Sequence, residues 1–250
     1  MKQAIIYTLD FDGVICDSAL ETGISAWKAA SQIWGDFSSI LPTAEQSAQF
    51  RQARPIMGTG YEAILIARML HDGETAEDIM SDYHVKTQKI IEDSALTVAG
   101  LKKVFAETRD QWIKEDLDNW VENNPLFPGI NEKLQSLSKQ GIWYIITTKQ
   151  ERFVKQILKA NQVELAGECI FGLDRNMSKE EVLIDLLAKH PEQQIYFIED
   201  MLPALLKIMN NSKLQTVKLF LALWGFNTAQ DKRDAEALPI ELIESPEQYS

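Results

Sequence analysis

The stretch that decides the fold lies at the start of the chain, where the apolar run Ala4–Leu9 (Ala-Ile-Ile-Tyr-Thr-Leu) leads directly into Asp10-Phe11-Asp12-Gly13. A short apolar run bounded by a turn signal is typical of a buried strand. Because side chains alternate along an extended chain, Asp10 and Asp12 should lie on the same side. Gly13 lets the backbone turn sharply behind them. The sequence therefore predicts two carboxylates at the carboxyl end of a buried strand.

Two neighbouring carboxylates repel each other, so both ionise only if a cation lies between them or if their pKa values separate. The 250 residues include only three histidines and two cysteines, which argues against a histidine- or cysteine-based metal site. Carboxylates favour a hard cation, and we therefore expect Mg²⁺. Such a cation would also make an acidic pocket attractive to an anionic substrate.

Beyond Asn123-Asn124-Pro125, strand-like and helix-like segments alternate along the chain. Strands are predicted at residues 142–146, 169–173, 194–198 and 217–223, with helices between them. This alternation predicts an α/β fold with a Rossmann-like, mainly parallel sheet and helices on both of its faces.

About 130 residues separate the first predicted strand from the second, whereas a strand–helix–strand unit takes about 30 or more. The excess has helical periodicity, so we expect an inserted all-α cap domain at 19–124 and a core formed by 1–18 plus 125–250. Three capping boxes are predicted at helix starts. They pair Ser18 with Glu21, Thr43 with Gln46, and Ser178 with Glu181.

Ligands of an open α/β sheet bind beyond the carboxyl ends of its strands. Thr147-Thr148 and Glu199-Asp200 each follow a predicted strand, and Lys179 begins a predicted helix between them. We expect these groups to meet Asp10 and Asp12 in one site. The Thr147 hydroxyl and nearby backbone N–H groups suit a phosphate oxygen, assisted by the N-terminus of the following helix.

The stretch Leu9–Ser18 (Leu-Asp-Phe-Asp-Gly-Val-Ile-Cys-Asp-Ser) resembles the first motif of the haloacid dehalogenase (HAD) superfamily, and in particular its phosphoglycolate-phosphatase-like hydrolases. Similar stretches are Leu126–Gly129, Ile145–Lys149 and Leu223–Phe226. The resemblance covers about residues 1–18 and 125–228, and the insert matches the C1-type cap of the family by position and helical character.

This resemblance implies that Asp10 is a nucleophile that forms an aspartyl-phosphate intermediate. It implies that Asp12 protonates the leaving oxygen and then deprotonates the attacking water. An acid at the position of Asp12 separates the phosphatases of the superfamily from its true dehalogenases. Thr147 and Lys179 would contact the phosphate group.

The same resemblance implies that the Asp10 carboxylate and the Asp12 backbone carbonyl bind Mg²⁺, and that Glu199 and Asp200 complete its ligand set. The family often has a second acid four residues after the first, where this chain has Ala204. Which of Glu199 and Asp200 contacts the metal therefore stays open. Likewise Glu180 follows Lys179 where many relatives have proline, which leaves Lys149 as the alternative lysine.

Three further residues are candidates for substrate binding. Gly13 and Thr148 adjoin the predicted catalytic groups. Arg54 lies one helical turn after Arg51 and just before the loop Gly58-Thr59-Gly60, where it could contact a carboxylate or phosphate. A solvated surface pair of arginines is an equally good interpretation.

The formal net charge of −12 argues against partners that are nucleic acids or anionic lipid surfaces. No apolar run approaches the 18 residues that a membrane span needs, and the N-terminus lacks a secretory pattern, so we expect a cytoplasmic protein. The expected function is a Mg²⁺-dependent phosphatase acting on a small phosphorylated metabolite. The alternatives are a phosphomutase of the same superfamily and a non-catalytic binding or regulatory protein.

Overall fold

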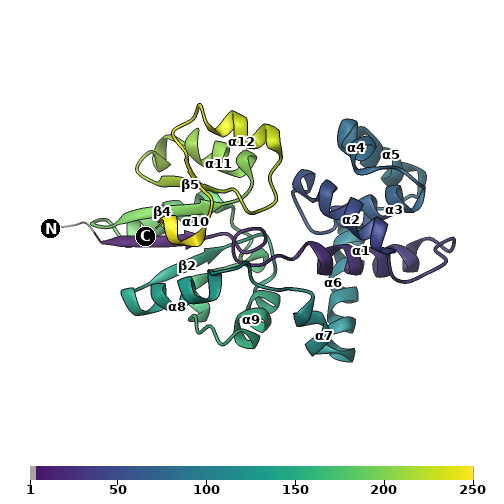
Figure 1. Cartoon of the computed structure of the whole chain (residues 1–250), viewed down its shortest axis with the longest axis horizontal. Helices are drawn as coiled ribbons and strands as arrows, with labels where there is room; N and C mark the ends of the chain where they lie inside the picture. Colours follow the sequence, from purple (N-terminus) through teal and green to yellow (C-terminus); the bar gives the residue numbers. More distant parts are fainter. Residues whose placement is uncertain (1–3, 250) are drawn as a thin grey trace. The chain divides into compact units, whose positions relative to one another are not determined.

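The computed structural model describes residues 4–249, and the chain divides into two compact units (Figure 1). The first unit comprises the residues up to Asp17 and from Pro125 onward, and the second is Ser18–Asn124. The first crossing between the units thus falls one residue before the predicted boundary. The Asp17 N–H donates a hydrogen bond to the Pro125 carbonyl at 2.8 Å, so the two connections leave the first unit side by side.

The first unit contains a six-stranded sheet in the order β3-β2-β1-β4-β5-β6, and all neighbouring strands are parallel. The strands are β1 (Ile5–Leu9), β2 (Trp143–Ile146), β3 (Ile170–Phe171), β4 (Gln194–Glu199), β5 (Lys218–Ala222) and β6 (Glu241–Ile243). The chain builds outward from β1 to β3 and then starts again at β4 on the other side of β1. This reversal is the point at which open α/β sheets bind ligands. The prediction of a mainly parallel, Rossmann-like sheet is confirmed.

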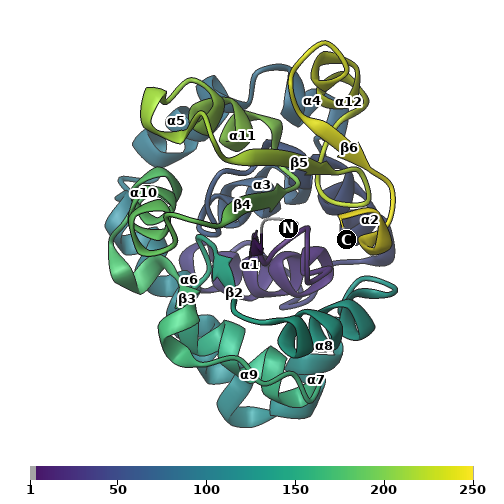
Figure 2. The same cartoon turned by 90° about the vertical axis from the view of Figure 1, so that its left-hand side faces the viewer.

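Helices cover both faces of this sheet (Figure 2). They are α8 (Ile130–Gln140), α9 (Glu151–Ala160), α10 (Lys179–Lys189), α11 (Leu202–Met209) and α12 (Ala229–Ala235). α10 and α11 pack against one face, where Ile6 and Phe197 point into a buried apolar cluster. Tyr7 points to the opposite face, as alternation along β1 requires, and the Lys133 ammonium of α8 lies 5.8 Å from its ring centre.

Short 3₁₀ helices connect several of these elements. They are η1 (Arg54–Ile56), η2 (Gly167–Cys169), η3 (Leu173–Arg175), η4 (Ser212–Leu214) and η5 (Pro246–Tyr249). Two strand predictions need correction. The strand predicted at residues 169–173 is only Ile170–Phe171, because η2 and η3 enclose it. The edge strand β6 was not predicted, because three residues are too few to show an alternating pattern.

The second unit is built from helices, and residues 18–124 contain no strand. Its helices are α1 (Ala19–Ile33), α2 (Ala44–Ala53), α3 (Glu62–His71), α4 (Ala76–Ser81), α5 (Tyr83–Asp93), α6 (Val98–Glu115) and α7 (Leu117–Glu122). Residues 63–67 of α3 are all buried, so this helix forms the centre of the unit's core. Trp27 of α1, Phe50 of α2 and Phe105 of α6 pack in the same cluster. The prediction of an all-α insert is confirmed.

Two of the three predicted capping boxes are formed, at Thr43 before α2 and at Ser178 before α10. The box predicted at Ser18 is wrong. The Ser18 side chain accepts no capping hydrogen bond, and its backbone angles (φ −86°, ψ 7°) are not those of an extended N-cap residue. Glu21, the expected partner, turns into the interior of the second unit instead.

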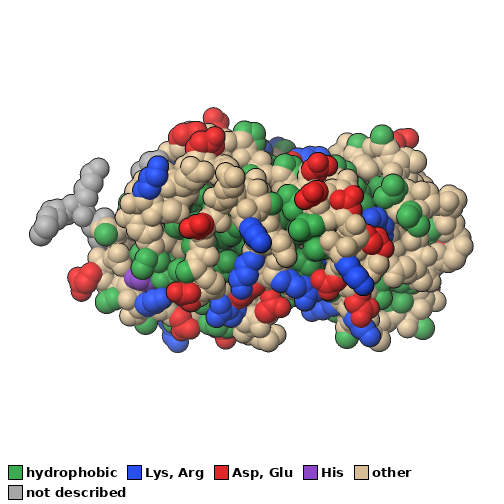
Figure 3. Space-filling model, turned by 90° about the horizontal axis from the view of Figure 1, so that it is seen from below, with side chains coloured by type: hydrophobic (Ala, Val, Ile, Leu, Met, Phe, Trp, Pro, Cys, Tyr) green, Lys and Arg blue, Asp and Glu red, His purple; other side chains and the backbone are tan. Residues whose placement is uncertain are grey.

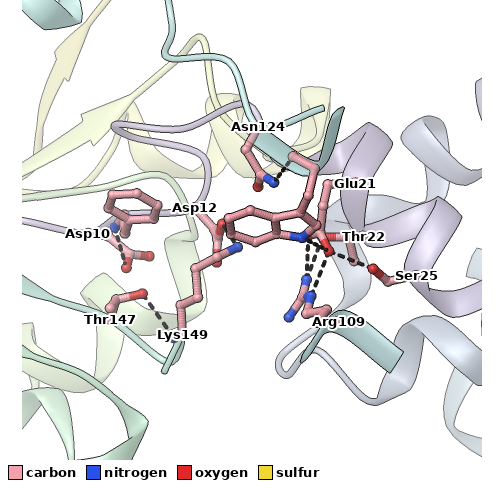
Figure 4. Close-up of polar contacts among 11 residues, drawn as sticks. Asp10, Asp12, Glu21, Thr22, Ser25, Arg109, Asn124, Thr147 and Lys149 are labelled. Carbon is pink, nitrogen blue, oxygen red and sulfur yellow. Dashed lines mark hydrogen bonds and ion pairs between the residues drawn. The ribbon is translucent and has the colours of Figure 1, made fainter. Parts of the chain in front are cut away.

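The Glu21 carboxylate is fully buried and joins three helices of the second unit (Figure 4). Arg109 of α6 donates to its two oxygens from Nε and Nη2, both at 2.7 Å. Ser25 Oγ donates at 2.6 Å and Trp120 Nε1 of α7 at 3.2 Å. A buried carboxylate needs such partners because an uncompensated charge in the interior is costly. The ion pair therefore fixes α6 against α1, and the Trp120 hydrogen bond adds α7.

On the face shown in Figure 3, lysine and arginine side chains are interspersed with aspartate and glutamate rather than gathered into one basic surface. Across residues 4–249, none of the helices combines the length and the apolar character needed to cross a bilayer.

Candidate active site

Apart from Lys179, the predicted site residues of the first unit lie at or just beyond the carboxyl ends of β1, β2 and β4. The sheet positions two of them by extending its hydrogen-bond ladder one residue beyond the strands. The Asp10 N–H donates to the Ile198 carbonyl at 2.9 Å, and the Thr147 N–H donates to the Phe171 carbonyl at 2.9 Å. Asp200 follows directly after β4. The central strands of the sheet thus position the backbone of Asp10, Thr147 and Asp200.

Lys179 joins two carboxylates from different strands. Its ammonium lies 2.9 Å from Asp10 Oδ2 and 2.6 Å from Glu199 Oε2. Lys179 is the first residue of α10, whose start is fixed by the Ser178 capping box. The other oxygen of Asp10, Oδ1, accepts the Phe11 N–H at 2.7 Å. The structure therefore brings the predicted nucleophile and the predicted phosphate-binding lysine into direct contact.

The pKa values in this group depend on burial and on one another. Burial raises the pKa of Asp10 to about 7, the nearby Glu199 charge adds to this rise, and Lys179 opposes it. Burial also disfavours the charged forms of Lys179 and Glu199. For Lys179 the attraction to Asp10 and Glu199 outweighs burial, and for Glu199 the attraction to Lys179 outweighs it. The pKa of Lys179 is therefore held above its ordinary value and that of Glu199 below it. The site strongly favours added positive charge next to Asp10.

Three of the four predicted metal ligands form a cluster suited to a cation. Asp10, Glu199 and Asp200 are all buried, and each offers an oxygen within 4.8 Å of the others. Buried carboxylate oxygens are the donors that a hard cation such as Mg²⁺ prefers, so this donor set fits the ion. The side chain of Asp12 lies outside the cluster, and metal binding by its backbone carbonyl stays a prediction.

Asp200 is held in place by the loops around it. Its Oδ2 accepts the Phe226 N–H at 2.6 Å, and the Asn227 side-chain amide donates to its backbone carbonyl at 3.1 Å. Gly13 has a φ of +90°, and a Cβ at this position would overlap the Asp200 carboxylate. The structure thus shows that Gly13 makes room for Asp200, while the predicted contact of Gly13 with substrate stays a prediction.

Lys149 contacts the remaining acid of the first motif. Its ammonium lies 2.9 Å from Asp12 Oδ1, as Figure 4 shows for the side chain reaching from the end of β2. Its backbone N–H donates to Thr147 Oγ1 at 3.1 Å. Lys149 and Lys179, which the sequence offered as alternatives, therefore contact different carboxylates. Thr148 is exposed at the same strand end.

Arg54 lies in the second unit, where it begins η1 and is half-buried. A contact between Arg54 and substrate stays a prediction. Two contributions to the site could not be found from the sequence: the Phe226 N–H on Asp200, and the ion pair between Lys149 and Asp12. The signals in the sequence were the position of Lys149 immediately after Thr147-Thr148 and the stretch Leu223–Phe226, which resembles a stretch of the family.

No protein-family model matches this chain, and no curated protein is found as a relative. Solved structures do match over nearly the whole length. One is a predicted phosphatase from Clostridium acetobutylicum, 15% identical, with 100% of this chain and 97% of that chain covered and a TM-score of 0.62.

Two more are a predicted phosphoglycolate phosphatase from Haemophilus somnus and a haloacid dehalogenase-like family hydrolase from Streptococcus pneumoniae. The first is 16% identical, with coverage of 98% and 96% and a TM-score of 0.61. The second is 18% identical, with coverage of 100% and 98% and a TM-score of 0.57. The chain therefore has the fold of HAD-like hydrolases, which confirms the α/β core with a helical insert that the sequence predicts.

Proposed function

We propose that this chain is a Mg²⁺-dependent phosphatase that hydrolyses a small phosphate monoester through an aspartyl-phosphate intermediate. The observation that carries the proposal is the buried cluster of Asp10, Glu199 and Asp200 at the switch point of the sheet, with Lys179 bridging the first two. A fold shared with HAD-like hydrolases supports it, because Asp10 directly follows β1, as the resemblance of the first motif implies for the nucleophile.

The charges of the site support a divalent cation. Asp10, Asp12, Glu199 and Asp200 bring four carboxylates, and Lys149 and Lys179 bring two ammonium groups. Full ionisation leaves two negative charges, which one divalent cation would balance. Asp10, Glu199 and Asp200 would hold it. When bound, Mg²⁺ supplies positive charge that neutralises the phosphoryl oxygens.

The residues of the chain would then share the reaction. The Asp10 carboxylate attacks phosphorus while the bond to the ester oxygen breaks, and Asp12 gives that oxygen a proton, so that the alcohol leaves. Water then attacks the phosphorus of the aspartyl phosphate, Asp12 accepts a proton from the water, and phosphate leaves with the Asp10 carboxylate restored. Thr147 and Lys179 bind phosphate oxygens and hold the group in line.

A structural neighbour is described as a predicted phosphoglycolate phosphatase, so phosphoglycolate belongs in the first panel of substrates, beside sugar phosphates and nucleotides. We propose that the helical unit acts as a cap that sets specificity, with Arg54 binding an anionic group of the substrate.

The test is a screen of phosphorylated metabolites and p-nitrophenyl phosphate with purified protein and Mg²⁺. Turnover should disappear with EDTA and fall more than about a thousandfold in Asp10→Asn, because a nucleophile cannot be replaced by its amide. Asp185→Asn, which changes an exposed aspartate of α10, is the matched control and should retain activity.

Two other results would point to the alternatives. Turnover that requires a bisphosphate activator would identify a phosphomutase. A folded protein that binds Mg²⁺ but turns over no member of the panel would identify a binding or regulatory protein and reject the proposed phosphatase.

A further inference from the structure

The side chain of Lys149 is fixed within the first unit to an unusual degree. Only 1% of it is exposed, compared with 18% of the Asp12 side chain that it contacts. A lysine is buried this deeply only when its charge is paired, and the ammonium meets Asp12 Oδ1 at 2.9 Å. Lysine side chains have several rotatable bonds, so burial removes freedom that a surface lysine would keep.

Both backbone polar groups of Lys149 form hydrogen bonds. Its N–H donates to Thr147 Oγ1 at 3.1 Å, and its carbonyl accepts the Leu173 N–H at 3.1 Å. Gly172 makes this second contact possible, because a Cβ there would lie only 2.7 Å from the Lys149 carbonyl oxygen. These contacts at the ends of β2 and β3 thus fix the backbone from which the Lys149 side chain extends.

The two lysines of the site therefore contact different acids. Lys179 contacts Asp10 and Glu199, which belong to the carboxylate cluster, whereas Lys149 contacts Asp12, whose side chain lies outside it. A lysine that served only as a second phosphate ligand would not need to be paired with Asp12, the proposed general acid and base. The pairing instead fixes one carboxyl oxygen of Asp12.

We propose that Lys149 is a positioning residue that holds the Asp12 carboxyl group in the orientation from which it exchanges a proton with the ester oxygen and the attacking water. This inference rests on the proposed phosphatase function. Because Oδ1 is held by the ammonium, the transferred proton is carried by the other carboxyl oxygen. Lys149 acts through Asp12 and does not itself touch the reacting atoms.

The test compares two substrates whose leaving groups differ in their need for a proton. An alkyl phosphate needs a general acid, whereas p-nitrophenyl phosphate expels a stable phenolate without one. In single-turnover experiments that follow release of the leaving group, Lys149→Met should lower the rate for the alkyl ester by about a hundredfold to ten-thousandfold and for the aryl ester by less than about tenfold. Steady-state turnover should fall for both esters, because hydrolysis of the shared aspartyl phosphate needs Asp12 as the base. Asp12→Asn should show the same contrast, and the double variant should be no slower than Asp12→Asn alone.

A second readout separates positioning from phosphate binding. Calorimetric titration with inorganic phosphate in Mg²⁺ should give the same affinity for Lys149→Met as for the unaltered protein. Lys159→Met, an exposed lysine on α9, is the matched control for both measurements. Equal losses in the rate of leaving-group release from both esters, or a weakened affinity for phosphate, would make Lys149 a phosphate ligand and overturn the inference.

A third measurement does not depend on turnover. A double-mutant cycle of Lys149→Met and Asp12→Asn on the urea unfolding midpoint should show coupling between the two side chains. Its absence would overturn the inference even in an active enzyme. If the unaltered protein hydrolyses neither ester, the phosphatase proposal fails first and the catalytic part of this inference fails with it, whatever the coupling.

Discussion

The buried ion pair of the second unit gives the sharpest test of how this chain is stabilised. Arg109→Met keeps much of the length of the side chain but removes its charge, and leaves the fully buried Glu21 carboxylate without its bidentate partner. Breaking a buried pair in this way costs about 3–5 kcal/mol of unfolding free energy. With a urea dependence of about 2 kcal/mol per M, the unfolding midpoint should fall by about 1.5–2.5 M.

The assay is urea unfolding followed by tryptophan fluorescence, because four of the six tryptophans lie in the second unit. The informative comparison is Glu21→Gln combined with Arg109→Met. The glutamine carbonyl still accepts hydrogen bonds from Ser25 and Trp120, but no charge stays buried. Replacing both partners of a buried pair is often close to neutral, so the double variant should recover most of the lost stability.

Lys103→Met supplies the matched control on the same helix. Lys103 and Glu107 form an exposed ion pair at 3.8 Å, and such pairs contribute little, so the midpoint should not change. A double variant no more stable than Arg109→Met alone would refute the reasoning, since the loss would then come from packing rather than from an uncompensated charge.

Further predictions concern the first unit. The folded pKa of Asp10 lies above its unfolded value of 3.8, at about 7, so the folded apoprotein holds a proton that the unfolded chain has released; its stability should fall as pH rises from about 4 to 7. Mg²⁺ must displace this proton, so its affinity, measured by thermal shift, should be about fivefold lower at pH 6 than at pH 7 and rise by no more than about twofold above pH 7. Asp10→Asn should remove this dependence, and an equal slope in that variant would contradict it. Gly13→Ala should abolish Mg²⁺-induced stabilisation, because the new Cβ overlaps the Asp200 carboxylate at a positive φ; unchanged stabilisation would show that the loop can move aside. Asp200→Asn should weaken Mg²⁺ binding by at least about tenfold, with far-UV circular dichroism confirming the fold and unchanged affinity excluding Asp200 as a ligand.

The apolar runs that became β1, β2 and β4 are long and sharply bounded, so their strands and the parallel sheet followed from pattern alone. β3 and β6 have two and three residues, and pairing with a neighbouring strand, rather than local preference, defines them. Ser18 and Glu21 show the opposite case. Their local capping pattern is not formed, because Glu21 pairs instead with Arg109, a buried residue 88 positions away.

The residues of the candidate site divide in the same way. Asp10, Thr147 and Asp200 follow strands directly, and the carboxyl ends of parallel strands meet at one edge, so the sequence by itself determined that these groups converge. It also predicted a site for a hard cation, because acids without enough histidine or cysteine favour such an ion. Only the tertiary structure decided which lysine meets which acid. That choice depends on where two long, flexible side chains end, and neighbours distant in sequence set those positions: the α10 cap for Lys179 and the Gly172 contact for Lys149.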